Sequence, residues 1–567
     1  MMTSLIVAVL LLLFPLSSSQ LRVSGKNGGT ACVACTLIVG MTEQLSQYHN
    51  QSVVEAMEMI CRYLPEGLYR RACDSLFEEY GAAVIKLLET KETGDIVCLA
   101  LGMCTNETGH ICHIFPLPER ADSPALSKRV QRANQIARSV NGYSRLSPCS
   151  LPGISEICKL IDRFADDHLP LYDVDGDKFS LLETFRGSSW RGKDCDDLNS
   201  DIYPGRRSTG DAEVDTNCNG IVGIDPVTHN TYEDMWCNGT QQYGTVLLGD
   251  SVGAHFHIPP AWLTASKLNE LVFEHLPFMV ENELDWPQFS SVTAFMNISW
   301  LDVIDGPVDS LYLKLREINQ CNHRDYQNIG VNGARSSAMA NDIVKSLARH
   351  QDLDHPLFIV HELLGNDVCN GHHDMSHMTT PEEFYANNKR TFEYIDQHVP
   401  PHSRMFVYGI VDGRILYNSL HNRIHPIGQL NNDVTYSDLY DYLNCLEISP
   451  CFGWLNTDEK WRNQTTQRGK ELNSALKRLL DDMTFTNLEV LYIEDVINET
   501  ISVWEAQGGK VWQLLEPVDG FHCNQLANAL AAQVVWSKVE KDYPHWIPPV
   551  NPNNADINNK FGDQGGY

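Results

Sequence analysis

The sequence has no long hydrophobic run after its N-terminus. Beyond residue 20, no segment approaches the roughly 18 consecutive apolar residues that a membrane-spanning helix needs. The one apolar run, Leu5–Phe14, is too short to cross a bilayer and is followed by small residues. This pattern predicts a secretory signal peptide over residues 1–20, although no Lys or Arg precedes the run. We therefore expect a mature protein without a transmembrane anchor.

Basic residues are also scarce. The chain of 567 residues has 43 Lys and Arg against 73 Asp and Glu, so its formal net charge is −30. A nucleic-acid-binding protein needs a cationic surface, so this composition argues against nucleic acid as a partner. It provides no direct electrostatic attraction to an anionic lipid surface either.

Cysteine, in contrast, is abundant. The 17 cysteines favour an oxidising compartment, and their odd number leaves at least one without a partner inside the chain. Acceptor sequences for N-glycosylation agree with this. We expect a secreted or luminal glycoprotein, for example of secretory vesicles or a lysosome-like compartment. The candidate glycosylation sites are Asn50, Asn106, Asn238, Asn297, Asn463 and Asn498.

Residues 28–112 predict a small helical domain joined by disulfides. Apolar residues recur at helical spacing in Val33–Leu45, in Val54–Leu64 and again around Ile85. A domain of this size gains stability from disulfides. Cys32-x-x-Cys35 could also be a redox or zinc motif, but no second such pair completes a metal site. The six cysteines are Cys32, Cys35, Cys61, Cys73, Cys98 and Cys104.

Residues 113–148 lose the apolar periodicity and carry several Arg and Lys together with Ser and Gly. This composition predicts an exposed linker with a proteolytic processing site. The alternative is a solvated helix.

Residues 149–235 are rich in oxygen ligands. Asp173-Val-Asp175-Gly-Asp177 places carboxylates at positions 1, 3 and 5 of a loop, and Asp215-Thr-Asn217-Cys-Asn219-Gly220 repeats this spacing, which is that of an EF-hand loop. Hard oxygen ligands favour Ca²⁺, so we expect two or three structural calcium ions rather than a disordered acidic loop. The candidate ligands are Asp173, Asp175, Asp177, Phe179, Asp194, Asp196, Asp197, Asn199, Ile202, Asp215, Asn217, Asn219 and Ile221, with Phe179 and Ile221 acting through backbone carbonyls.

Residues 236–545 predict an α/β domain. Short apolar runs alternate with helical segments, which is typical of a mostly parallel sheet. Ligands of such sheets lie at the carboxyl ends of the strands. Gly249-Asp250-Ser251 and Gly365-Asn366-Asp367 each follow a predicted strand, so both point to one rim. The predicted strands are Thr245–Leu248, Leu311–Leu315, Pro356–Leu364, Met405–Ile410 and Val490–Ile493.

Three residues make this rim a candidate catalytic site. Ser251, at the tip of a buried strand, is a candidate nucleophile, and Asp519-x-x-His522 supplies a carboxylate and a base. This is the set of groups that a serine hydrolase needs. Each motif alone is weak, since a Gly-Asp-Ser triplet is often only a strand-to-helix turn.

Two other histidines and one cysteine lie near these motifs. His255 and His257 follow the serine but have no carboxylate at a fixed sequence offset, so we assign them to packing or to an acyl pocket. Cys523 is the candidate unpaired thiol. A cysteine nucleophile is the rival interpretation, but it would leave Ser251 unexplained.

These motifs carry two family resemblances. The cysteine spacing of residues 28–112 resembles the saposin B type, which implies the pairs Cys32–Cys104, Cys35–Cys98 and Cys61–Cys73 and a helical fold that opens onto lipid. The three blocks around Ser251, Asn366 and His522 resemble the SGNH (GDSL) hydrolases, which have a flavodoxin-like fold. That resemblance implies an oxyanion hole made by the N–H groups of Ser251 and Gly333 and the side chain of Asn366, although Asn332-Gly333-Ala334 is also an ordinary turn sequence.

The chain as a whole resembles the acyloxyacyl hydrolase family. The resemblance rests on the order of its parts and on the strings Gly249–His257, Cys321–Asn328, Glu516–His522 and Phe561–Gly566. It implies a lipase that removes secondary fatty acyl chains from the lipid A of bacterial lipopolysaccharide. It also implies processing into a small saposin-like and a large catalytic subunit, with residues 546–567 as a C-terminal tail.

The same resemblance implies that a disulfide joins the two subunits. We take Cys112–Cys445 as the simplest choice, and as a further hypothesis the other pairs are Cys149–Cys158, Cys195–Cys218, Cys237–Cys321 and Cys369–Cys451, which leaves Cys523 free. Two alternatives stay open for the function: a phospholipase or lysophospholipase of broader specificity, and a lipid carrier with a vestigial hydrolase site.

Overall fold

The structure is a computed structural model that describes residues 25–107, 109–117, 123–140, 154–156, 159, 168–296 and 303–562. The predicted signal peptide, Asn297 and the predicted pair Cys149–Cys158 lie outside the described residues.

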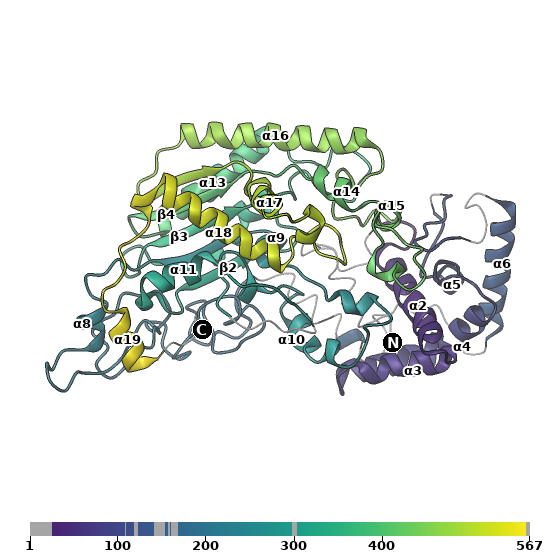
Figure 1. Ribbon diagram of the computed structural model, residues 1–567, viewed down its shortest axis with the longest axis horizontal. Helices are drawn as coiled ribbons and strands as arrows, with labels where there is room; N and C mark the ends of the chain where they lie inside the picture. The colour runs from purple at the N-terminus through teal and green to yellow at the C-terminus, as the bar shows by residue number, and fades with distance from the viewer. Residues whose placement is uncertain are drawn as a thin grey trace.

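A parallel five-stranded sheet forms the centre of the larger domain (Figure 1). Its strand order is β2-β1-β3-β4-β5. This is the flavodoxin-like order, in which ligands bind at the carboxyl ends of β1 and β3. The strands are β1 (Gly244–Gly249), β2 (Tyr326–Gly330), β3 (Leu357–Glu362), β4 (Ser403–Tyr408) and β5 (Leu488–Ile493).

The predicted strand at Leu311–Leu315 is wrong, because this segment belongs to helix α11 (Leu311–Ile318). The hydroxyl of Ser310 caps the helix by accepting a hydrogen bond from the Leu313 N–H, at 3.0 Å. Leu311 and Leu315 lie one turn apart on the same face and are buried against the sheet. The other four predicted strands are confirmed.

The strand that the sequence did not reveal is β2, whose middle is polar. The Gln327 side chain donates to the Ala348 carbonyl at 2.7 Å, and the Asn328 side chain donates to the Gly253 carbonyl at 2.9 Å. Because these buried amides are hydrogen-bonded, they are tolerated in a strand that shows no apolar run.

Helices cover both faces of the sheet (Figure 1). Alternate strand residues point to opposite faces, so Leu247 packs with α11, α17 and α18, while Val246 and Leu248 face the side of α12, α13 and α16. The helices of this part are α8 (Tyr232–Trp236), α9 (Ser251–Ala254), α10 (Leu276–Glu281), α12 (Ser336–Asn341), α13 (Pro381–His398), α14 (Arg414–Leu420), α15 (Tyr436–Cys445), α16 (Glu459–Asp482), α17 (Val496–Ala506), α18 (Gln525–Asp542) and α19 (Asn554–Phe561). None of the helices in the described residues is long and apolar enough to cross a bilayer.

The N-terminal helices form the small domain at the right of Figure 1. They are α2 (Gly29–His49), α3 (Val53–Tyr63), α4 (Leu68–Glu89) and α5 (Gly94–Leu101). Disulfides join Cys32 to Cys104, Cys35 to Cys98 and Cys61 to Cys73, which are the pairs that the saposin resemblance implies.

Much of the segment expected to be an exposed linker is helix α6 (Pro124–Ser139). The Ser123 hydroxyl caps it by accepting from the Leu126 N–H at 3.0 Å, and Pro124 occupies the first turn. Leu126, Ala133 and Ala137 are buried, and α6 packs on α4 and α5. The linker prediction is therefore corrected for these residues, where small side chains at helical spacing provide a narrow packing face.

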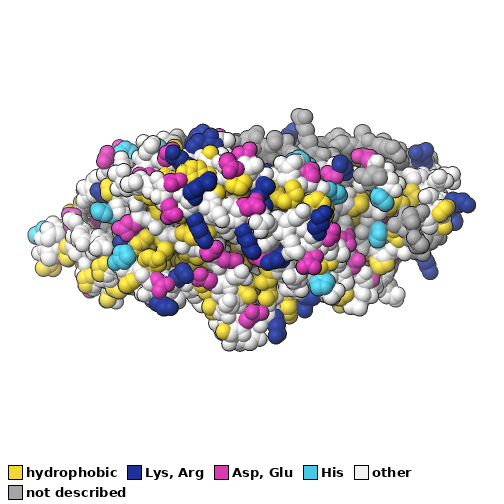
Figure 2. Space-filling model, turned by 90° about the horizontal axis from the view of Figure 1, so that it is seen from above, with side chains coloured by type: hydrophobic (Ala, Val, Ile, Leu, Met, Phe, Trp, Pro, Cys, Tyr) yellow, Lys and Arg dark blue, Asp and Glu magenta, His cyan; other side chains and the backbone are white. Residues whose placement is uncertain are grey.

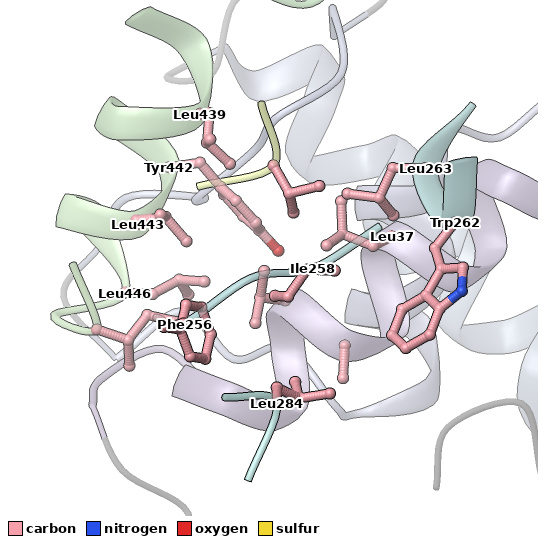
Figure 3. Close-up of a cluster of buried hydrophobic side chains, with 14 of the residues drawn as sticks. Leu37, Phe256, Ile258, Trp262, Leu263, Leu284, Leu439, Tyr442, Leu443 and Leu446 are labelled. Atoms are coloured by element: carbon pink, nitrogen blue, oxygen red, sulfur yellow. The ribbon is translucent and has the colours of Figure 1, made fainter. Parts of the chain in front are cut away.

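The two domains share a buried apolar interface (Figure 3). Leu37 of α2 lies among Ile258 and Leu263 of the segment that follows α9, and Tyr442 and Leu446 close the cluster from the side of α15. The Tyr442 hydroxyl also donates to the hydroxyl of Thr36 at 3.0 Å. The saposin-like domain therefore packs directly against the residues that come after Ser251.

The remaining described disulfides also match the expected pairs. They join Cys112 to Cys445, Cys195 to Cys218, Cys237 to Cys321 and Cys369 to Cys451. Cys523 is a free thiol. The five glycosylation candidates within the described residues are all exposed, as N-glycosylation requires: Asn50, Asn106, Asn238, Asn463 and Asn498.

Candidate active site

Ser251 lies at the carboxyl end of the central strand β1 and begins the short helix α9. The carboxylate of Asp250 accepts hydrogen bonds from the Val252 N–H and from the Leu364 N–H, both at 2.9 Å. Asp250 therefore fixes the turn after β1 to the segment after β3. These two hydrogen bonds hold Ser251 at the rim where both strands end.

His522 and Asp519 complete a hydrogen-bonded chain with this serine. His522 Nε2 lies 2.7 Å from Ser251 Oγ, and its Nδ1 lies 2.6 Å from Asp519 Oδ2. Asp519 Oδ1 accepts from the backbone N–H groups of Phe521 and His522, at 2.7 and 3.1 Å. The structure thus brings together the three residues that the sequence singled out.

The surroundings of Asp519 keep it ionised beside His522. Burial acts to raise the pKa of Asp519, but the charge and hydrogen bond of His522 and the two backbone donors lower it below its usual value. Asp519 is therefore a carboxylate that accepts the Nδ1–H of His522. The Nε2 lone pair then faces the serine hydroxyl, which is the tautomer needed for proton removal.

A deep apolar pocket opens beside Ser251. It is lined by residues that follow both strand ends, including Ser251 after β1 and Gly365 after β3. Its few polar groups lie near the serine, and hydrocarbon side chains make the rest of its wall. These include Leu364, Val411, Ile415, Leu416, Trp454, Ile497, Ile501, Leu514 and Phe521. Such a pocket fits a hydrocarbon chain whose carbonyl group is held at Ser251.

Comparisons with known proteins identify the family. The family model "Saposin-like domain" matches residues 31–159, and the model "GDSL-like Lipase/Acylhydrolase" matches residues 246–535. The acyloxyacyl hydrolase of Homo sapiens is 43% identical and covers 99% of each chain; that of Mus musculus is 44% identical and covers 95% of this chain and 94% of its own. This chain belongs to the acyloxyacyl hydrolase family. It is accordingly an acyl ester hydrolase, with a saposin-like domain before a lipase domain.

In this chain, the candidate oxyanion-hole residues lie at the same rim. Asn366 lines the pocket together with Ser251. Gly333 follows the carboxyl end of β2, which pairs with β1 through Gly330 and Gly249. Its φ of 74° is one that a glycine adopts without strain. Gly333 is not among the pocket-lining residues, so its role stays a prediction.

One histidine near the serine has the carboxylate that the sequence did not reveal. His257 Nδ1 lies 2.8 Å from the carboxylate of Glu516, which is 259 residues away in the chain. The charge of Glu516 raises the pKa of His257 despite its burial. Its Nε2, however, bonds to the Val303 carbonyl at 2.9 Å rather than to Ser251. This partner lies at no fixed sequence offset from His257, and the ion pair ties the loop of Asp519 to the segment after α9.

The other candidates near the serine are not placed to act as base or nucleophile. His255 is fully buried, and burial lowers its pKa to about 3, so it is neutral and belongs to the packing. Burial and the neighbouring carboxylates raise the pKa of the Cys523 thiol to about 12. A thiol with that pKa is protonated at neutral pH and is a poor nucleophile. This leaves Ser251 as the nucleophile of the site.

The first acidic loop brings carboxylates together as a hard cation requires. Ligand oxygens of Asp173, Asp175 and Asp197 lie within 4.8 Å of one another, as do those of Asp175, Asp177 and Asp194. One oxygen each of Asp175, Asp177 and Asp194 is buried without a hydrogen-bond partner. Burial and the neighbouring carboxylates raise the pKa of Asp177 to about 8. Repulsion and unpaired oxygens of this kind fit a bound cation.

The second loop repeats the hydrogen-bond pattern of the first. Position 1 accepts from the N–H of position 6 in both, with Asp173 accepting from Lys178 at 2.9 Å and Asp215 from Gly220 at 2.7 Å. Glu233, which the sequence analysis missed, accepts from the amides of Asn217 and Asn219, at 3.1 and 3.0 Å. Glu233 lies outside the Asp-x-Asn-x-Asn spacing, so only the fold brings it to this loop.

Proposed function

We propose that this protein hydrolyses the ester bonds that attach secondary fatty acyl chains to the hydroxyl groups of primary acyl chains in the lipid A of bacterial lipopolysaccharide. Its relatives carry the name acyloxyacyl hydrolase. The observation that carries the proposal is the chain Asp519–His522–Ser251 at the mouth of an apolar pocket. The residue roles in the following steps are part of the same proposal.

The reaction proceeds by acyl transfer to Ser251. His522 Nε2 takes the proton of the serine hydroxyl as Oγ attacks the ester carbonyl, and it returns that proton to the departing hydroxyl oxygen. The Ser251 N–H, the Gly333 N–H and the Asn366 side chain stabilise the oxyanion. His522 next removes a proton from water, which attacks the acyl-enzyme, and the free fatty acid leaves with Ser251 restored.

The saposin-like domain supplies further apolar space for the lipid. An apolar pocket lies between its helices and is lined by side chains that include Ile38, Met57, Leu76 and Val84. We propose that this domain holds acyl chains of the substrate that are not cleaved. Association with an anionic glycolipid then rests on apolar burial rather than on net charge. Figure 2 shows acidic and basic side chains intermingled on one face, so that face is not uniformly negative.

The remaining expectations complete this proposal. Calcium ions stabilise the loops around Asp173 and Asp215, since clustered carboxylate and amide oxygens suit Ca²⁺ better than softer metals. Proteolysis within residues 113–148 yields a small and a large subunit that Cys112–Cys445 keeps joined. The disulfides agree with an extracellular or luminal protein, and we place it in secretory vesicles or a lysosome-like compartment.

The test compares purified wild type with Ser251→Ala. Each is incubated with lipopolysaccharide and, separately, with a diacyl phospholipid, and the released fatty acids are identified by mass spectrometry. We expect wild type to release the secondary chains of lipopolysaccharide and Ser251→Ala to release none. Release mainly from the phospholipid would keep the mechanism and replace the substrate by a broader lipid class. Equal release by wild type and Ser251→Ala, or release by neither, would refute the proposal and favour a lipid carrier.

A further inference from the structure

A second cavity lies behind the acyl pocket. It is small and lies between the sheet and helices α11, α17 and α18. The short side chains of Ala531 and Ala532 on α18 line it.

The two cavities share four lining residues, which are Val252, Ile497, Cys523 and Ala527. They come from α9, α17, the residue after the catalytic histidine and α18.

The far cavity ends on a polar group. Glu362, the last residue of β3, lines it, is 3% exposed, and has one carboxyl oxygen without a hydrogen-bond partner. Burial raises its pKa to about 8, so the group is a neutral acid at pH 7. Glu362 lines this cavity and not the acyl pocket, so the polar group lies beyond the four shared residues.

We propose that Val252, Ile497, Cys523 and Ala527 form the end wall of the acyl pocket, and that Cys523 determines the longest acyl chain that the enzyme accepts. Cys523 is the adjustable member of the wall, because its side chain is small, is not needed for a disulfide and does not act in the chemistry. Its backbone is fixed by pairing with Leu515. The assignment rests on the proposed acyl-transfer function.

The test measures acyl-chain preference in three variants. Cys523→Ala opens the wall, and Ala527→Val narrows it. Ala532→Val is the matched control, because it lies on the same helix and lines only the far cavity. The substrates are p-nitrophenyl esters of the C10 to C18 saturated acids in detergent micelles, and the readout is the ratio of kcat/KM for the C16 ester to that for the C12 ester.

Each additional buried methylene is worth about fourfold in kcat/KM, from about 0.8 kcal/mol per CH₂. We expect Cys523→Ala to raise the C16/C12 ratio at least fourfold and Ala527→Val to lower it. Ala532→Val alone should leave the ratio unchanged, and when added to Cys523→Ala it should cancel the gain. The assignment is overturned if Cys523→Ala raises the C16/C12 ratio less than fourfold over wild type. It is also overturned if the double variant Cys523→Ala, Ala532→Val keeps the higher ratio.

A second measurement separates this assignment from the proposed function. Binding of the free C10 to C18 fatty acids to the Ser251→Ala protein is measured by calorimetry, with and without Cys523→Ala. A shift of the tightest-binding acid to longer chains supports the end wall even if no ester is hydrolysed. If Ser251-dependent hydrolysis is intact but neither the ratio nor the binding shifts, the end wall is wrong and the proposed function stands.

Discussion

The substitution Asp519→Asn isolates the contribution of one hydrogen bond to catalysis. Asp519 Oδ1 accepts two backbone hydrogen bonds, so an asparagine keeps its carbonyl oxygen on that side and turns its NH₂ group toward His522 Nδ1. His522 must then accept at Nδ1 and carry its proton on Nε2. That nitrogen lies 2.7 Å from Ser251 Oγ and can no longer remove the serine proton.

In Ser-His-Asp hydrolases the wrong tautomer costs about 10⁴-fold in kcat, which is about 5.4 kcal/mol of transition-state stabilisation. We expect a fall of that size in fatty acid release from lipopolysaccharide, with KM little changed. Glu516→Gln is the matched control, because it makes the same chemical change in a buried carboxylate paired with a different histidine, His257. Its kcat should fall far less. If Asp519→Asn keeps kcat within tenfold of wild type, or if Glu516→Gln has the larger effect, then the assignment of His522 and Asp519 is wrong.

Three further predictions concern stability and assembly. EDTA should lower the Tm of the wild type, since an ion at 100 times its Kd contributes about 2.7 kcal/mol, and an unchanged melting curve with no calcium by elemental analysis would contradict the calcium assignment. Burial raises the pKa of Asp95 to about 7, so the folded state holds a proton that the unfolded state loses. Between about pH 4 and 7 the unfolding free energy should therefore fall by up to about 1.4 kcal/mol per pH unit as the pH rises. Urea titrations should show that Asp95→Asn removes this slope. After cleavage within residues 113–148, wild type should migrate as one band on a non-reducing gel, and Cys445→Ser should migrate as two.

The candidate catalytic residues could be found in the sequence because they stand in two short strings. Ser251 directly follows a buried strand, and Asp519 lies three residues before His522, so both features are visible without a structure. The contact between His257 and Glu516 could not be predicted from the sequence, because a buried ion pair needs no fixed sequence separation. The contacts of Glu233 with Asn217 and Asn219 could not be predicted either, since only the fold brings Glu233 to their loop.

The errors in the secondary structure have a common physical origin. The sequence analysis identifies strands by apolar runs, which fails where buried side chains are polar and paired, as in β2, and where a short apolar run is one face of a helix, as at Leu311. At α6 the sequence favours an exposed linker over the alternative of a solvated helix, because the buried face of this helix consists of one leucine and two alanines. Small side chains allow close helix packing but give little apolar signal in the sequence.

The position of Phe256 links the two domains to the chemistry. The centroid of its ring lies 4.8 Å from that of His522. Phe256 also belongs to the interface cluster that contains Leu37 of the saposin-like domain (Figure 3). Phe256, Leu37 and the disulfide Cys112–Cys445 all lie outside residues 113–148, so the proposed proteolysis there would leave them in place. Separation of the domains, in contrast, would expose the apolar side of Phe256 and free the ring beside His522. We therefore expect Cys112–Cys445 to keep the saposin-like domain packed beside His522 after cleavage.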